Sequence, residues 1–170
     1  MITAEQLIRH LRLRPLPEEG GLFTQTYVSA ENLPASSLSA RYQAPHPFST
    51  AIFYLLTDAP DSFSALHLLP TDEIYHFYLG NPVEMLHLFP DGSSASILLG
   101  NDVLAGQKLQ HVAPAGVWQG SRLRPGGKLA LLGTTMAPGY IDADYTGGKR
   151  VELTQQYPDQ TETIRLLTRR

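Results

Sequence analysis

The sequence contains no cysteine, which excludes disulfide bridges, thiolate nucleophiles and metal sites built on sulfur. It also lacks an apolar run long enough to cross a membrane as a helix. The opening residues do not resemble a secretory signal, so we expect a cytoplasmic protein. Lysine and arginine total 13 against 16 aspartate and glutamate residues, and no basic stripe is present. We therefore expect neither nucleic acid nor membrane as a partner.

The length of 170 residues suits one domain with one continuous core. We expect a single domain over residues 1–170, with its core at about 20–145. Glycine and proline contribute 14 and 13 residues, which is typical of a fold with many tight connections.

The two ends of the chain predict helices. Thr3 and Gln6 stand at the spacing of a capping box and precede a partial apolar stripe, and Pro15 and Pro17 should end this helix. Apolar residues scattered among polar ones after Tyr145 predict short helices on the outside of the core.

The middle of the chain has the periodicity of strands. Short apolar or aromatic segments alternate with turns rich in glycine, proline and aspartate, and no helices lie between them. This pattern favours a closed antiparallel barrel or sandwich over a parallel sheet. The predicted strands are Leu22–Val28, Ala51–Leu56, Phe63–Leu69, Ile74–Leu79, Val83–Phe89, Ser96–Leu99, Leu109–Val112 and Leu129–Met136.

One segment in this region carries a recognisable motif. His67, Leu69, Glu73 and Gly80 have the order and spacing of the first cupin motif, with Leu69 at the position of its second histidine. Residues two apart on a strand face the same side, and Glu73 can enter the lumen from the next strand. Gly80 allows the tight turn that follows.

A second stretch resembles the second cupin motif. Its Pro114-Ala115-Gly116 turn is intact, and Gln119 stands where metal-binding cupins have a histidine. Further blocks resemble a family of small cupins of unknown function; they are Pro17–Phe23, Ser49–Leu56, Asp72–Gly80, Val117–Gln119 and Met136–Tyr140.

This resemblance implies an all-β fold, the double-stranded β-helix or cupin jelly-roll barrel, with an N-terminal helix and short C-terminal helices. It also implies a homodimer and a structural relationship to epimerases of the dTDP-dehydrorhamnose type. Their metal-free general base is a histidine that matches His67, so His67 and Glu73 are the predicted catalytic residues. A histidine titrates near neutral pH, and a neighbouring carboxylate favours its charged form.

The resemblance bears directly on cofactors. Metal-binding cupins hold one divalent cation at the positions of His67, Leu69, Glu73 and Gln119. One of these positions is aliphatic here and another is an uncharged amide, so we expect no cofactor. If a divalent metal is present, its predicted ligands are His67, Glu73 and Gln119.

Four more residues are predicted to bind the ligand. Gln119 occupies a motif position, and Trp118 offers a ring that can stack on a sugar or a base. Alternation along the strand places His87 in the lumen, and Tyr75 follows the motif glutamate by two residues. The competing interpretation for Trp118 is a packing anchor.

The remaining histidines and a pair of acids receive structural interpretations. His76 alternates with the motif glutamate and should point away from it, toward a dimer face or a structural contact. His46 and His111 carry no motif and are expected at the surface or in packing. Asp142 and Asp144 either line the barrel mouth or are solvated.

Three functions remain open from the sequence. The first is metal-independent acid–base chemistry of epimerase or isomerase type on a small molecule such as a sugar nucleotide. The second is a non-enzymatic module that holds a metabolite in the same pocket. The third is a metal-dependent enzyme such as a dioxygenase, completed by a further ligand such as His87. One barrel hosts many activities, so the fold does not decide among them.

Overall fold

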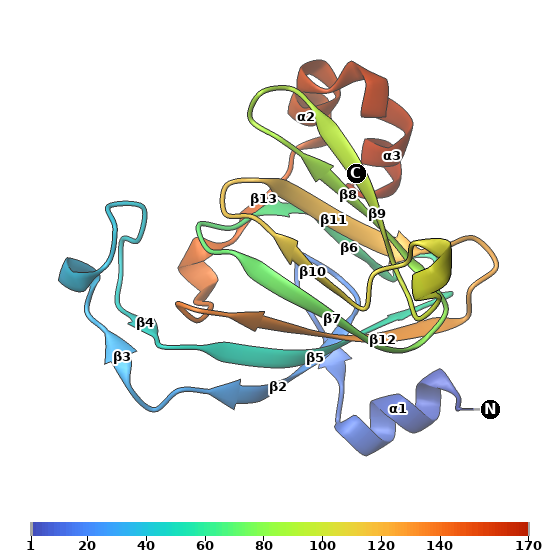
Figure 1. The fold of residues 1–170 in the computed structure, drawn as a ribbon, viewed down its shortest axis with the longest axis horizontal. Helices are drawn as coiled ribbons and strands as arrows, with labels where there is room; N and C mark the ends of the chain where they lie inside the picture. Colours follow the sequence, from blue (N-terminus) through green and yellow to red (C-terminus); the bar gives the residue numbers. More distant parts are fainter. Residues whose placement is uncertain (1, 170) are drawn as a thin grey trace.

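Two antiparallel sheets face each other in the computed structural model, which describes residues 2–169 (Figure 1). The larger sheet has the strand order β1 (Arg14–Pro15), β2 (Leu22–Val28), β5 (Thr50–Thr57), β12 (Leu129–Met136), β7 (Glu73–Gly80) and β10 (Gln110–Ala113). The smaller sheet has the order β13 (Thr146–Gly147), β6 (Phe63–Leu68), β11 (Trp118–Leu123), β8 (Val83–Leu88) and β9 (Ser94–Leu99). This is the predicted jelly-roll arrangement.

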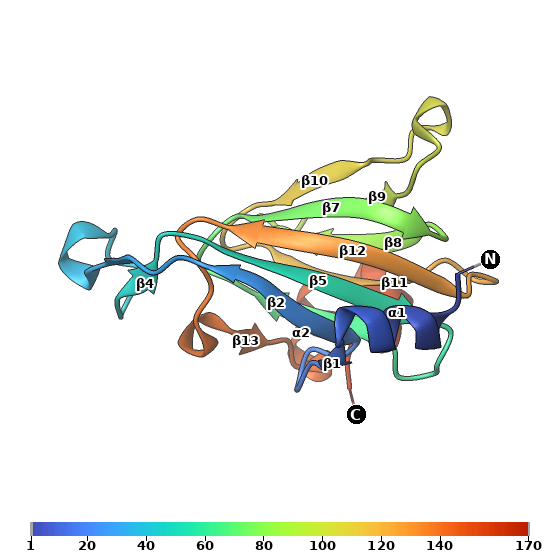
Figure 2. The same cartoon turned by 90° about the horizontal axis from the view of Figure 1, so that it is seen from below.

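Shorter elements extend and connect the sheets. The pair β3 (Asn32–Leu33) and β4 (His46–Pro47) projects beyond the larger sheet (Figure 2). The α-helices are α1 (Ala4–Leu11), α2 (Arg150–Gln156) and α3 (Thr161–Leu166). Single turns of 3-10 helix are η1 (Ala35–Ser37), η2 (Val103–Ala105), η3 (Asp142–Asp144) and η4 (Pro158–Gln160).

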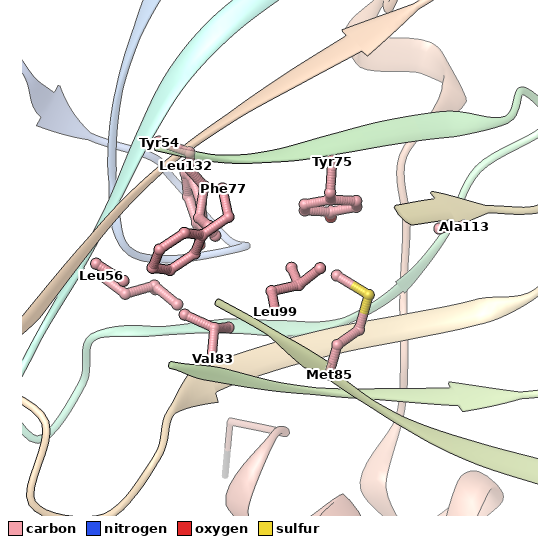
Figure 3. Packing of buried hydrophobic residues seen from close by; sticks show 10 residues of the cluster. Tyr54, Leu56, Tyr75, Phe77, Val83, Met85, Leu99, Ala113 and Leu132 are labelled. Carbon is pink, nitrogen blue, oxygen red and sulfur yellow. The ribbon is translucent and has the colours of Figure 1, made fainter. Parts of the chain in front are cut away.

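The lumen between the sheets is closed at one end by a hydrophobic core. Side chains from both sheets meet there because alternate residues of each strand point inward (Figure 3). The buried members are Tyr54, Leu56, Tyr75, Phe77, Val83, Met85, Leu99, Ala113, Ala130 and Leu132. This packing leaves the other end of the lumen for polar groups.

The N-terminal helix covers the outer face of the larger sheet (Figure 2). Its predicted capping box is confirmed, because the Thr3 side chain accepts from the Gln6 amide and the Gln6 side chain accepts from the Thr3 amide. The helix ends before the predicted prolines, because Arg12 adopts the left-handed conformation with φ 55°.

The two C-terminal α-helices cover the outer face of the smaller sheet, as predicted (Figure 1). Leu153 of α2 and Ile164 of α3 are buried against Leu66 and Leu86. Both faces of this sheet are therefore covered, one by the larger sheet across the lumen and the other by the helices.

Every predicted strand segment forms a strand, with ends that differ by two residues or fewer. The strand β11 was not predicted. Its lumen face carries Gln119 and Ser121 in place of apolar residues, so it lacks the hydrophobic alternation that marks the other strands. No helix among residues 2–169 is long and apolar enough to cross a membrane.

Candidate functional site

A cavity of about 470 Å³ opens at the polar end of the lumen, where β12 ends and β7 begins. This volume falls within the range of ligand pockets in proteins. The larger sheet supplies one wall, and the segment after β12 supplies another. Residues that bear on its chemistry are Arg14, Glu19, Leu69, Glu73, Tyr140, Asp142 and Tyr145.

Glu73, the first residue of β7, presents its carboxylate to this cavity and is only 7% exposed. Its Oε2 atom accepts a hydrogen bond from the Tyr75 hydroxyl at 3.0 Å and another from Gln119 Nε2 at 3.0 Å. Tyr75 lies two residues along the same strand and Gln119 comes from the facing sheet. Two predicted ligand-binding residues therefore hold the predicted catalytic carboxylate in place.

His67 lies on β6 behind the cavity wall, with 1% of its surface exposed. Its Nδ1 atom donates to the Ala65 carbonyl at 2.8 Å, because a carbonyl oxygen only accepts. Its Nε2 atom therefore faces Glu73, with Oε2 at 3.9 Å. His67 does not line the cavity itself and reaches a ligand only through its neighbours.

The charge state of His67 follows from this environment. Burial opposes its protonation, but the negative charges of Glu19 and Glu73 and the contact with Glu73 outweigh this effect and raise the pKa of His67 to about 9. At neutral pH the ring is an imidazolium between two acidic residues.

Glu19 is a site residue that sequence reasoning missed. It lines the cavity and accepts a hydrogen bond from the Ser64 hydroxyl at 2.7 Å. Burial raises its pKa, as does the neighbouring carboxylate of Glu73, while His67 acts in the opposite direction. The turn that follows it needs glycine, because Gly20 has φ +100° and a Cβ there would lie 2.5 Å from the Phe63 carbonyl oxygen. The Pro17–Phe23 block was a signal for the family, but nothing in it pointed to a site.

Two tyrosines after β12 were also missed. Tyr145 lines the cavity and stacks on His67, with ring centroids 5.3 Å apart and an interplanar angle of 20°. Tyr140 lines the same wall. Burial raises the pKa of both phenols, so their hydroxyls are protonated at neutral pH and can donate hydrogen bonds. In this segment the sequence pointed only to Asp142 and Asp144 as residues that could line the barrel mouth.

The wall that carries these tyrosines is held by a buried contact between a histidine and an aspartate. His46 Nε2 contacts Asp144 Oδ2 at 2.9 Å, and His46 Nδ1 donates to the Ala44 carbonyl at 2.7 Å. His46 is fully buried, so it belongs to packing rather than to the surface, and Asp144 is not the solvated acid that was one of the two expectations.

The other predicted residues fall in different places. Trp118 lies on the outer face of β11 and packs against the cluster beneath the C-terminal helices, away from the cavity. His87 points into the lumen but contacts the ring of His111, with centroids 5.0 Å apart, and does not line the cavity. His76 is on the opposite face of β7 from Glu73, where its Nε2 contacts the Thr135 hydroxyl at 3.2 Å.

The donor set at the cupin motif does not fit the divalent metal that metal-binding cupins hold. Leu69 supplies no donor, and Glu73 Oε2 already accepts two hydrogen bonds. Among residues 2–169, no group of three or more histidine, aspartate or glutamate side chains is arranged to hold a metal ion. The residues at the motif positions therefore do not fit a metal site.

Comparisons with known proteins agree with the fold. An uncharacterized protein of Saccharomyces cerevisiae is 29% identical over 154 residues, which cover 86% of this chain and 72% of the yeast protein. A hypothetical protein from Leishmania major superposes with a TM-score of 0.87 at 25% identity, covering 99% of this chain and 100% of the other. A protein of Shewanella oneidensis gives a TM-score of 0.86 at 26% identity, covering 99% of each chain.

The family comparison covers most of the chain. The profile described as Cupin superfamily (DUF985) matches residues 5–147, which include both motif regions and the cavity walls up to Tyr145. The protein therefore belongs to this family of the cupin superfamily.

Proposed function

We propose that the cavity binds a small molecule and that Glu73 moves a proton on it without a metal. The observation that carries this proposal is the position of Glu73, which faces the cavity while His67 Nε2 lies behind it at 3.9 Å. A carboxylate that faces the cavity lies within reach of a bound molecule, as a general base must. The reaction class is epimerisation or isomerisation next to a carbonyl group.

The roles differ from those expected from the sequence. His67 was expected to be the general base, but with a pKa of about 9 it already carries its proton at neutral pH. We assign proton abstraction to Glu73, and we assign to His67 the stabilisation of the negative charge on the Glu19 and Glu73 carboxyl groups. Glu73 is the catalytic residue in this scheme, and His67 is a positioning residue.

The proposed step is balanced by groups in the cavity. The carbon–hydrogen bond beside the carbonyl breaks, the proton moves to Glu73, and the electron pair moves to the carbonyl oxygen. The hydroxyl of Tyr145 lines the same cavity and can donate a hydrogen bond to that oxygen. Glu73 returns its proton to the former carbonyl carbon to give an isomer, and the hydroxyl proton of the deprotonated carbon passes to the former carbonyl oxygen. An epimer forms when water protonates the opposite face of the deprotonated carbon and Glu73 gives its proton to solvent.

The charges of the cavity wall favour some classes of substrate over others. Arg14 is the cation of the lining, whereas Glu19, Glu73 and Asp142 are acidic. A diphosphate group would meet this acidic wall unfavourably. We therefore favour a neutral hydroxylated carbonyl compound, such as a free sugar, over the sugar nucleotide that the resemblance suggested.

Deuterium exchange tests the proposal. Neutral sugars and hydroxyketones are incubated with the protein in D₂O, and nuclear magnetic resonance detects deuterium at the carbon next to the carbonyl; a dTDP-sugar is included for comparison. We expect exchange on a neutral compound, its loss in Glu73→Gln and its retention in the exposed control Glu31→Gln. Exchange that survives Glu73→Gln would refute the assigned role.

A non-enzymatic binding module is the second candidate, and one observation favours it. Both hydrogen bonds to Glu73 end on Oε2, so this oxygen is already partnered within the protein. Saturable binding of a compound without any exchange, weakened by Glu73→Gln, is the result that this candidate predicts. Isothermal titration calorimetry on the same compounds distinguishes the two.

A further inference from the structure

Buried polar atoms without hydrogen-bond partners gather in the lumen away from the cavity. Among the described residues these atoms are His87 Nε2, His111 Nε2, Gln119 Oε1 and Ser121 Oγ. His87 is 2% exposed and Gln119 is 2% exposed. Polar groups at this depth nearly always have a partner, and the other described side chains do not supply one to this cluster.

The strand pairing brings three of these residues together. Gln119 of β11 is the direct cross-strand partner of His87 of β8, so both side chains project from the same face. His111 comes from β10, where it pairs with Tyr75, and its ring centroid is 5.0 Å from that of His87. Two imidazoles and one amide oxygen therefore share one region of the lumen.

We propose that His87 and His111 bind one divalent first-row metal ion, such as Zn²⁺, with Gln119 Oε1 as a third donor. Imidazole nitrogen binds such ions at 2.0–2.1 Å, and two imidazoles on one tetrahedral ion place their ring centroids roughly 5 Å apart. The observed separation matches this value. Only Gln119 is shared with the cupin motif, so this is a different site from the motif position.

The protonation of both histidines agrees with metal binding. A ligand imidazole must be neutral. Burial lowers the pKa of His87 to about 4, with a smaller contribution from His111. Burial and, to a lesser extent, Lys108 lower the pKa of His111. Both rings are therefore neutral at pH 7.

The ion can reach this site from outside. The strand β10 lies at the edge of the larger sheet, and His111 is partly exposed. No third histidine, aspartate or glutamate joins the pair among residues 2–169, so water completes the coordination and we expect moderate affinity. The Gln119 amide also donates to Glu73, which links the ion to the cavity carboxylate through one side chain.

Calorimetric titration of untagged protein with ZnCl₂ at pH 7.5 tests this site. We expect one ion per chain, and we expect His111→Ala and His87→Gln each to weaken binding by about tenfold or more. His111→Ala should disturb the folded structure less than His87→Gln, because His111 is partly exposed. The matched control is His10→Ala on the exposed face of α1, which should bind as the unmodified protein does.

Two results would overturn the proposal. One is the absence of saturable Zn²⁺ binding in protein that circular dichroism shows to be folded. The other is binding that persists in both His111→Ala and His87→Gln but is lost in Glu73→Gln, because the ion would then occupy the cavity. Loss in His111→Ala and His87→Gln, with Glu73→Gln unaffected, supports the site and leaves the proposed function of Glu73 untouched.

Discussion

Two histidines show how strongly the environment alters the same side chain in this protein. The free imidazole of histidine titrates near pH 6.5, yet two acidic neighbours raise the pKa of His67 to about 9, whereas burial lowers that of His87 to about 4. Both residues project into the same lumen. Both rings are buried, but the carboxylates outweigh the effect of burial on the pKa of His67, whereas burial dominates at His87 and the neighbouring His111 adds to it.

The raised pKa of His67 predicts a pH-dependent stability. Because its folded pKa exceeds its unfolded value of 6.5, its stabilisation is fully present below about pH 6.5 and is lost as the pH rises through about 9. The shift corresponds to about 3 kcal/mol at most. Urea unfolding at pH 6 and at pH 9.5 measures it.

The variant His67→Gln serves as the reference for this measurement. It cannot titrate, so we expect its free energy of unfolding to fall less between these pH values than that of the unmodified protein. An equal fall in both proteins would show that other groups cause the pH dependence.

At the scale of elements, the C-terminal helices contribute stability through their buried leucine and isoleucine side chains. Leu153 of α2 is 2% exposed and packs against the outer face of the smaller sheet. Leu153→Ala leaves a cavity there, and we expect it to lower the free energy of unfolding by about 2–5 kcal/mol. Chemical denaturation measures the change.

The same helix offers a matched control. Val151 is 66% exposed, so Val151→Ala should change stability by about 0.5 kcal/mol or less. Equal effects of the two substitutions would mean that α2 is not docked on the sheet in solution.

The position of the segment after β12 depends on the buried contact between His46 and Asp144. Asp144→Asn removes the carboxylate that contacts His46 Nε2, and loss of a buried hydrogen bond to a carboxylate costs about 1.5–3 kcal/mol. We expect lower stability and faster hydrogen exchange in residues 140–146, which form a wall of the cavity. Hydrogen exchange followed by mass spectrometry detects this change.

The comparison for this experiment is Asp159→Asn, at an exposed position in η4. Its exchange in residues 140–146 should match that of the unmodified protein. If Asp144→Asn also leaves that exchange unchanged, the contact between His46 and Asp144 does not hold the wall.

At the scale of the whole molecule, the expected homodimer is a prediction that the structure of one chain does not test. Val28 pairs with Thr50, which places the exposed side chains of Val28 and Phe48 at one end of the larger sheet. Apolar patches of this kind are typical of interfaces. We expect light scattering to give twice the 18.7 kDa chain mass and Phe48→Glu to shift the protein toward the monomer.

The matching substitution on another face is Leu104→Glu, at a residue that is 98% exposed in η2. It should leave the dimer intact. A monomeric mass for the unmodified protein, or dissociation by Leu104→Glu alone, would contradict this placement of the interface.

Local sequence was sufficient for most elements of the fold. Strand alternation and turn residues act over a few positions, so the apolar segments and the capping box at Thr3 were predicted correctly. The strand β11 was not predicted because its inward residues Gln119 and Ser121 are polar, and Gln119 donates to Glu73. The inward polar side chain of Gln119 thus interrupts the hydrophobic alternation of this strand and also serves the site.

The amino-acid sequence by itself determined the β-rich architecture, the exclusion of cysteine chemistry and the motif that points to His67 and Glu73. Only the tertiary structure decided that Glu19 and Tyr145 join them, that Trp118 turns toward the helices and that His67 is charged at neutral pH. The physical reason is the distance along the chain between the residues that interact. Periodicity and capping depend on neighbours within one turn or one strand, whereas burial and charge depend on groups that come from distant parts of the chain.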